Sequence, residues 1–154
     1  MKDLSLIISR KNAYEDIRVK SHIDCETIVD ATERYKVEAG TEKEEQVQQC
    51  ITDAFGDVLQ LLRRFLADNL TIIGTKTVYD GTSDLQLPLR VSDRRAHYLL
   101  LTLAPAVHAY VVDFALAKYY ATIRPVFAGP YTSRLAGEAA AIETIIYTKQ
   151  PPES

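Results

Sequence analysis

The sequence is poor in the residues from which most catalytic and metal-binding motifs are built. It has no tryptophan, one methionine, two cysteines and three histidines among 154 residues. Its six glycines form neither a GxxxxGK nor a GxGxxG phosphate-binding pattern, and no serine lies in a G-x-S-x-G elbow. His22 and Cys25 would supply two zinc ligands, but structural zinc usually needs four. We therefore expect no catalytic residue, no cofactor, no metal and no small-molecule substrate.

The chain also lacks an excess of basic residues. Its 18 Lys and Arg are outnumbered by 21 Asp and Glu, which gives a formal net charge of −3 at pH 7. Non-specific binding to duplex nucleic acid needs a basic surface, so this balance argues against such binding. We also expect no specific nucleic-acid binding. We interpret the adjacent arginine pairs, Arg63-Arg64 and Arg94-Arg95, as solvated helix ends.

Long hydrophobic runs are rare as well. Residues 4–8 are too few for the apolar region of a signal peptide, so we expect a cytoplasmic protein in which Cys25 and Cys50 are free thiols. Residues 98–117 are apolar enough to suggest a membrane span of about 20 residues. They include His108 and Asp113, however, and an ionisable group at mid-bilayer costs at least ~2.5 kcal/mol. We interpret this stretch as a helix buried in a core or a subunit interface, not in a membrane.

The length and composition fit one globular domain. Hydrophobic residues make up 47% of the chain and charged residues 25%, which is ordinary for a compact protein. We expect a single helical domain over residues 1–150 and a frayed tail over residues 151–154.

Residues 44–65 carry the clearest helical pattern. Apolar residues recur at three- and four-residue steps and so share one face. They are Val47, Cys50, Ile51, Ala54, Val58, Leu61, Leu62 and Phe65. Thr41 and Glu44 have the spacing of a capping box, in which each side chain bonds the other residue's backbone amide. This pattern predicts an amphipathic helix of about six turns.

Two shorter helices are predicted before it. Ser9 or Asn12 starts the first, which continues through Val19. Asp24 caps the second, and Gly40 ends it.

Two further helices are predicted in the second half. Ser92-Asp93 caps a helix over residues 94–120 that is apolar around most of its circumference, and Pro105 should kink or split it. After a connection over residues 126–130, a last helix covers residues 131–147.

Residues 71–91 change to the two-residue period of a β-strand. Leu85, Leu87, Leu89 and Val91 alternate with other residues, residues 75–79 are β-branched and aromatic, and residues 80–84 have turn composition. Pro88 cannot donate to a ladder, so its strand should be at an edge or bulged. The fold class that we expect is mainly α, a helical bundle with a β-hairpin insertion at about residues 71–91.

His108 and Asp113 are the ionisable side chains inside the most apolar helix. Buried ionisable groups are sometimes functional, since burial shifts their pKa values. We interpret both as structural, with a partner such as Tyr119, Tyr120 or Arg124. An enzyme with an unrecognised site that uses them is one alternative.

Three stretches, in their order and spacing, resemble a known protein family. They are residues 7–17 with the acidic loop and amphipathic helix that follow, residues 85–93, and residues 113–120 with Pro125, 131–138 and 145–152. Together they resemble small helical head–tail connector (neck or adaptor) proteins of tailed bacteriophages and prophages. The resemblance implies a non-enzymatic virion assembly subunit that forms a homo-oligomeric ring between portal and tail. It also implies a location in the cytoplasm of the bacterial host and then in the virion.

The expected partners are other copies of the chain and neighbouring virion proteins such as portal or tail subunits. The apolar hairpin face and the tyrosines of the last two helices are the interface candidates, because tyrosine is enriched at interfaces. These candidates are Leu85, Leu87, Leu89, Tyr119, Tyr120 and Tyr131. The other alternative is a small cytoplasmic helical adaptor or regulatory module that binds one protein partner.

Overall fold

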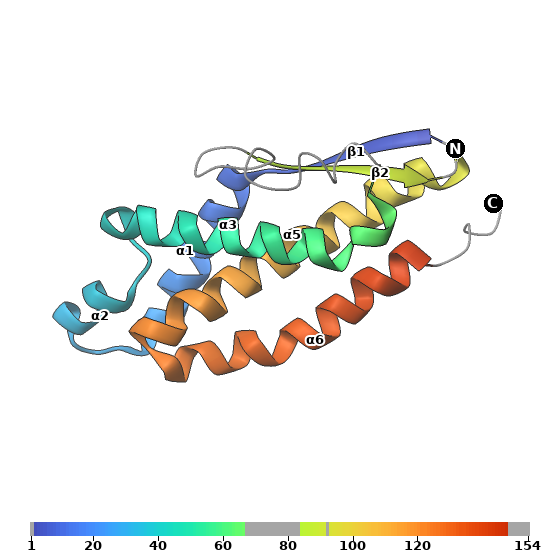
Figure 1. Cartoon of the computed structure of the whole chain (residues 1–154). Helices are drawn as coiled ribbons and strands as arrows, with labels where there is room; N and C mark the ends of the chain where they lie inside the picture. The colour runs from blue at the N-terminus through green and yellow to red at the C-terminus, as the bar shows by residue number, and fades with distance from the viewer. Residues whose placement is uncertain (1, 67–83, 92, 148–154) are drawn as a thin grey trace.

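The protein is a helical bundle with a small antiparallel sheet along one side (Figure 1). The computed structural model describes residues 2–66, 84–91 and 93–147. The longest helix, α5 (Asp93–Ile123), packs against α1 (Arg10–Asp24), α3 (Glu44–Leu61) and α6 (Pro125–Tyr147). The predicted mainly α fold class with a small β element is confirmed.

The sheet consists of β1 (Lys2–Ile8) and β2 (Leu85–Val91). The strands pair without interruption from Lys2 opposite Val91 to Ile8 opposite Leu85. Residues 85–91 are therefore a strand, as predicted, but the sequence analysis did not identify β1 as a partner. The predicted strand over residues 75–79 and residues 80–83 of its turn lie outside the described residues.

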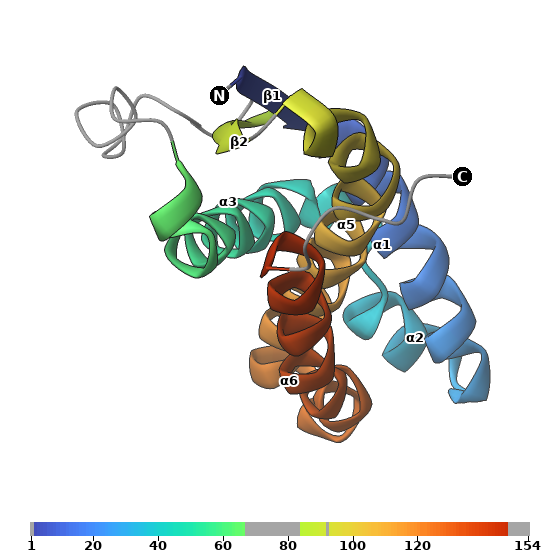
Figure 2. The ribbon, with the colours of Figure 1, turned by 90° about the vertical axis from the view of Figure 1, so that its right-hand side faces the viewer.

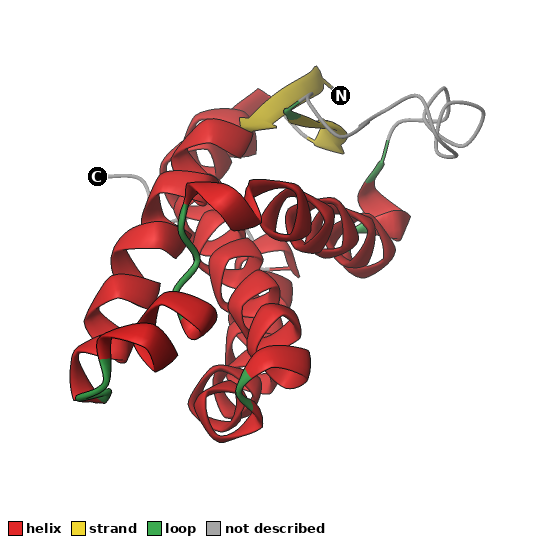
Figure 3. Cartoon of the chain, turned by 90° about the vertical axis from the view of Figure 1, so that its left-hand side faces the viewer, coloured by secondary structure: helices red, strands yellow, loops and turns green. Residues whose placement is uncertain are grey.

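The apolar face of the sheet packs on the protein's own helices. Leu4, Leu6 and Ile8 alternate along β1, and Leu85, Leu87 and Leu89 alternate along β2, with all six side chains buried. Figures 1 and 2 place the sheet and α6 on opposite sides of α5, and Figure 3 shows the two strands lying across the helices. The sheet thus closes one side of the hydrophobic core.

The first helix starts as predicted, and the second does not. Ser9 caps α1 by accepting a hydrogen bond from the Asn12 backbone amide at 3.1 Å, although α1 continues beyond Val19. The predicted cap at Asp24 is wrong, since the 3₁₀ turn η1 (Cys25–Thr27) follows α1. Asp30 caps α2 (Ala31–Val37), because it directly precedes that helix and its carboxylate accepts from two amides.

The amphipathic stripe forms α3, but the predicted capping box is absent. A 3₁₀ turn, η2 (Thr41–Lys43), precedes the helix, and its cap residue, Lys43, makes no capping hydrogen bond with its side chain. The Lys43 ammonium instead donates to the carbonyls of Tyr35, Lys36 and Glu38 at the end of α2. The helix ends at Leu61, and η3 (Arg63–Phe65) completes the predicted stretch.

A single residue, Arg124, separates the last two helices in the chain. α5 runs through Pro105 without a break and ends at Ile123. The predicted connection over residues 126–130 is wrong, because α6 begins at Pro125. Proline suits the first helical position, where its missing amide would have no partner inside the helix. The helix ends at Tyr147, as predicted.

Within the described residues, one helical stretch is long and apolar enough to cross a membrane. It covers His97–Ile123 in α5, with a mean hydropathy of 1.7, and half of that stretch is buried inside the protein. Helices α1, α3 and α6 pack around α5, so packing in the protein core accounts for the apolar residues around its circumference.

Candidate functional site

Polar side chains of α1 contact α5 at three successive levels. The contacting residues on α1 are four apart and therefore lie on one face of the helix. The pairs, with the α1 residue first, are Asp16–His108, Lys20–Asp113 and Asp24–Tyr120. We call these six residues the polar seam. The seam brings together the two ionisable residues that sequence analysis singled out, together with three partners that it missed.

The two singled-out residues occupy different environments. Asp113 is only 4% exposed, and its Oδ1 lies 3.2 Å from Lys20 Nζ. The side chain of His108 is 29% exposed, and its Nε2 lies 2.6 Å from Asp16 Oδ2. Asp113 is therefore buried as expected, whereas His108 is only partly buried. Their ion-pair partners, Lys20 and Asp16, come from α1 and are not among the three residues expected as partners.

Asp24 joins α1 to both of the last two helices. Its Oδ2 accepts hydrogen bonds from the hydroxyls of Tyr120, at 2.9 Å, and Tyr131, at 2.5 Å. Burial raises the pKa of both tyrosines well above the ordinary value for tyrosine, and the negative charge of Asp24 raises it further. Both hydroxyls therefore stay protonated at neutral pH and act as hydrogen-bond donors, not as bases or nucleophiles.

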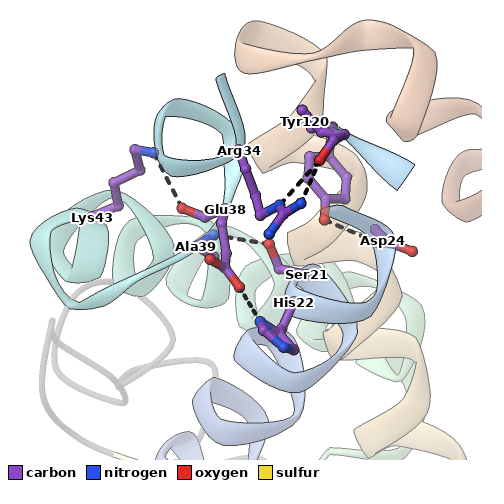
Figure 4. Close-up of polar contacts among 9 residues, drawn as sticks. Ser21, His22, Asp24, Arg34, Glu38, Ala39, Lys43 and Tyr120 are labelled. Carbon is purple, nitrogen blue, oxygen red and sulfur yellow. Dashed lines mark hydrogen bonds and ion pairs between the residues drawn. The ribbon is translucent and has the colours of Figure 1, made fainter. Parts of the chain in front are cut away.

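A second set of polar contacts fixes α2 against the end of α1 (Figure 4). His22 Nδ1 lies 2.5 Å from Glu38 Oε1, and Ser21 Oγ accepts from the Ala39 amide at 2.8 Å. Lys43 donates to the last carbonyls of α2 from the other side. Each of these side chains bonds another group of the fold, so the contacts have a structural role.

A groove of about 300 Å³ lies beside Asp24, between the end of α1 and the start of α6. Its lining residues are Ile23, Asp24, Thr27, Val126, Phe127, Pro130, Tyr131 and Arg134. The Arg134 guanidinium lies over the Tyr131 ring, 5.2 Å from its centroid. Ile23 and Val126 are exposed at the rim, so the groove has an apolar edge and one carboxylate that is already hydrogen-bonded.

The six predicted interface residues are not on the surface. Leu85, Leu87 and Leu89 are fully buried under the helices, and Tyr119, Tyr120 and Tyr131 are at most 5% exposed. The tyrosine hydroxyls are also used internally, Tyr119 by the Val37 carbonyl and the other two by Asp24. In the single chain the protein's own core takes up both the leucine face and the tyrosine rings, so these side chains are not available at its surface.

Other apolar side chains are exposed instead. Leu100 and Leu101 protrude near the start of α5, whereas Ile23, Val29 and Val126 protrude near its other end. Sequence analysis missed these residues because each one belongs to a segment whose other apolar residues are buried. Only the packing of the neighbouring helices decides which of them face solvent.

The described residues do not assemble a metal site. Across residues 2–66, 84–91 and 93–147, no group of three or more His, Cys, Asp and Glu is placed to hold an ion. Cys25 and Cys50 are free thiols, as expected. Burial raises the pKa of Cys25, and it raises the pKa of Cys50 to about 11, so neither is an activated nucleophile at neutral pH.

Comparison with known proteins adds no family. No protein-family model, curated protein or solved structure matches the chain.

Proposed function

We propose that the chain is a non-enzymatic virion assembly subunit, the head–tail connector or neck protein of a tailed phage or prophage. In this role copies of the chain contact one another in a ring and contact portal or tail subunits on either side. The observation that carries the proposal is the presence of unlike apolar surfaces at the two ends of α5.

The two surfaces are far apart along one rigid element. Leu101, at 64% exposure, lies near the start of α5, and Val126, at 78%, lies just beyond its end. The helix from Leu101 to Ile123 spans roughly 33 Å at about 1.5 Å per residue. One copy of the chain can therefore meet two neighbours at the same time without the neighbours colliding.

The surfaces also differ in charge. Residues 24–33 contain four carboxylates, and the cations beside Val126 are Arg124 and Arg134, whereas residues 90–95 contain three arginines and one aspartate. Opposite charge favours contact between the two different ends over contact between like ends. Contacts between unlike surfaces are heterologous, and they build rings when the rotation between copies closes.

The polar groups support a structural role in the same way. An enzyme could use the ionisable side chains of the polar seam, but each already has a partner in the fold. Asp113 pairs with Lys20, and His108 pairs with Asp16. The net charge of −3 also suits a conduit through which DNA passes without being held.

Genetic complementation tests the proposal. Deletion of the gene from the phage or prophage should leave DNA-filled heads that carry no tails, and the wild-type gene should restore tailed particles. Leu101→Asp should fail to restore them although the purified variant folds. Gln60→Asp, which adds the same charge at an exposed position of α3, should restore them.

Two results would overturn the proposal. One is the formation of infectious tailed particles in the deletion strain. The other is the absence of the chain from purified particles, and its recovery with a single host protein would favour the adaptor alternative.

A further inference from the structure

Two carboxyl groups meet where α5 packs on α6. Asp113 of α5 is almost fully buried, and Glu138 of α6 lies within hydrogen-bonding reach of it. Glu138 Oε1 is buried and has no hydrogen-bond partner among the described residues. Since ionised carboxylates only accept hydrogen bonds, two of them side by side leave both groups without a donor between them.

The surrounding charges do not remove this conflict. The groups that face the pair are Lys20 from α1, Tyr110 from α5, Tyr131 and Arg134 from α6, and Asp57 of α3 behind the Tyr110 hydroxyl. Lys20 is bonded to Asp113 and compensates one negative charge, not two. Arg134 lies over the Tyr131 ring near the protein surface. A second negative charge on Glu138 would therefore lie partly buried beside the first.

A proton on Glu138 resolves the conflict in one step. The protonated carboxyl becomes a donor that Asp113 accepts, and the cluster then holds one carboxylate opposite one ammonium. Burial, the hydrogen bond to Asp113 and the charge of Asp113 act in the same direction and raise the pKa of Glu138 to about 8.

We propose that Glu138 is protonated at neutral pH and donates a hydrogen bond to Asp113, and that this bond is a pH-sensitive contact between α5 and α6. It forms when the Glu138 carboxyl is protonated. When the proton is lost in alkaline solution, the two carboxylates repel each other and the middle of α6 separates more readily from α5.

The direction of the pH effect follows from proton linkage. Between the ordinary pKa of 4.5 and the raised value of about 8, the unfolded chain has released the Glu138 proton and the folded chain keeps it. The contribution of Glu138 to stability is therefore fully present below pH 4.5. It decreases as the pH rises through this window and is lost above about pH 8.

Two variants separate this proton from the other titrating groups. Glu138→Gln keeps a side-chain donor for Asp113 and cannot ionise, so its urea midpoint should fall less than that of the wild type between pH 6 and pH 9. At pH 9 it should be the more stable protein. Glu143→Gln removes an exposed carboxyl from the same helix and should leave the pH dependence of the wild type unchanged.

A direct measurement keeps the proposal testable if Glu138→Gln does not fold. Carbon NMR of the wild-type glutamate carboxyls should find one group that titrates near pH 8. Its resonance should be absent from the spectrum of Glu138→Asp, and in Asp113→Asn it should titrate at a lower pH, because the neighbouring negative charge is gone. Titration of every glutamate carboxyl below pH 6 would overturn the proposal. So would equal pH dependence of the urea midpoint in the wild type and in Glu138→Gln.

Discussion

The Tyr131 hydroxyl of α6 donates to the Asp24 carboxylate of α1 at 2.5 Å and so joins two helices that are more than 100 residues apart in the chain. Tyr120 donates to the same oxygen from α5, and the two rings lie 5.9 Å apart. One carboxylate therefore holds three helices together beside the groove.

Removing one of these hydroxyls should destabilise the protein. Tyr131→Phe should lower the free energy of unfolding by about 1–2 kcal/mol, because Asp24 loses one of its two donors in a partly buried setting. Tyr35→Phe, which removes the hydroxyl of an exposed tyrosine, should change it by less than about 0.5 kcal/mol. Urea denaturation measures both, and equal effects would contradict the role of Asp24.

The ammonium of Lys43 should contribute more to the stability of the fold than its partial exposure suggests. It donates to three carbonyls that end α2, and burial lowers its pKa. Lys43→Met should lower stability by about 1–3 kcal/mol, since these carbonyls lose their donor. Hydrogen exchange should then accelerate in α2, whereas Lys36→Met on the exposed face should leave it unchanged. Exchange in α2 as slow as in the wild type would show that Lys43 is dispensable.

The leucine face distinguishes folding from assembly. Leu87→Ala should lower the free energy of unfolding by about 2–5 kcal/mol, because the side chain is fully buried. Leu87→Asp should not fold at all, since it places an unpaired charge in the core. Leu101→Asp should fold normally, because Leu101 faces solvent. Circular dichroism during urea titration tests all three, and a folded Leu87→Asp protein would mean that β2 is not held as the structure has it.

The cysteines should be present as thiols and react slowly. Thiol titration of the unfolded, non-reduced protein should find two free groups. In the folded protein at pH 8 both should react with an aromatic disulfide much more slowly than in urea, because burial keeps Cys50 protonated up to about pH 11. Rapid reaction of either thiol in the folded state would contradict this.

The local pattern of residues predicted what depends on periodicity. The apolar stripe from Val47 to Leu62 formed α3, and the alternation from Leu85 to Val91 formed β2. In both, the spacing of the apolar residues determines which face of the element is buried. Leu4, Leu6 and Ile8 alternate in the same way, but the stretch was interpreted only as too short for a signal peptide. Its pairing with β2 joins residues 80 or so positions apart, and no local signal encodes it.

The polar seam and the exposed apolar surfaces could not be predicted for a related reason. Asp16, Lys20 and Asp24 have the spacing of any solvated helix face, and only the position of α5 turns them into partners. The tyrosines were expected at an interface between copies, yet their rings fill the core and their hydroxyls find partners inside it. Composition indicates which residues are amphipathic, but the packing decides which side they face.

Disulfide cross-linking between copies tests the central claim most directly. In purified tailed particles whose chains carry both Leu101→Cys and Val126→Cys, mild oxidation should produce a ladder of linked chains that ends at the ring size. Particles with either substitution alone should give no ladder, because the two unlike ends of neighbouring copies meet. Linked dimers in a single variant, or no linkage in the double variant, would contradict a ring built through the two ends of α5.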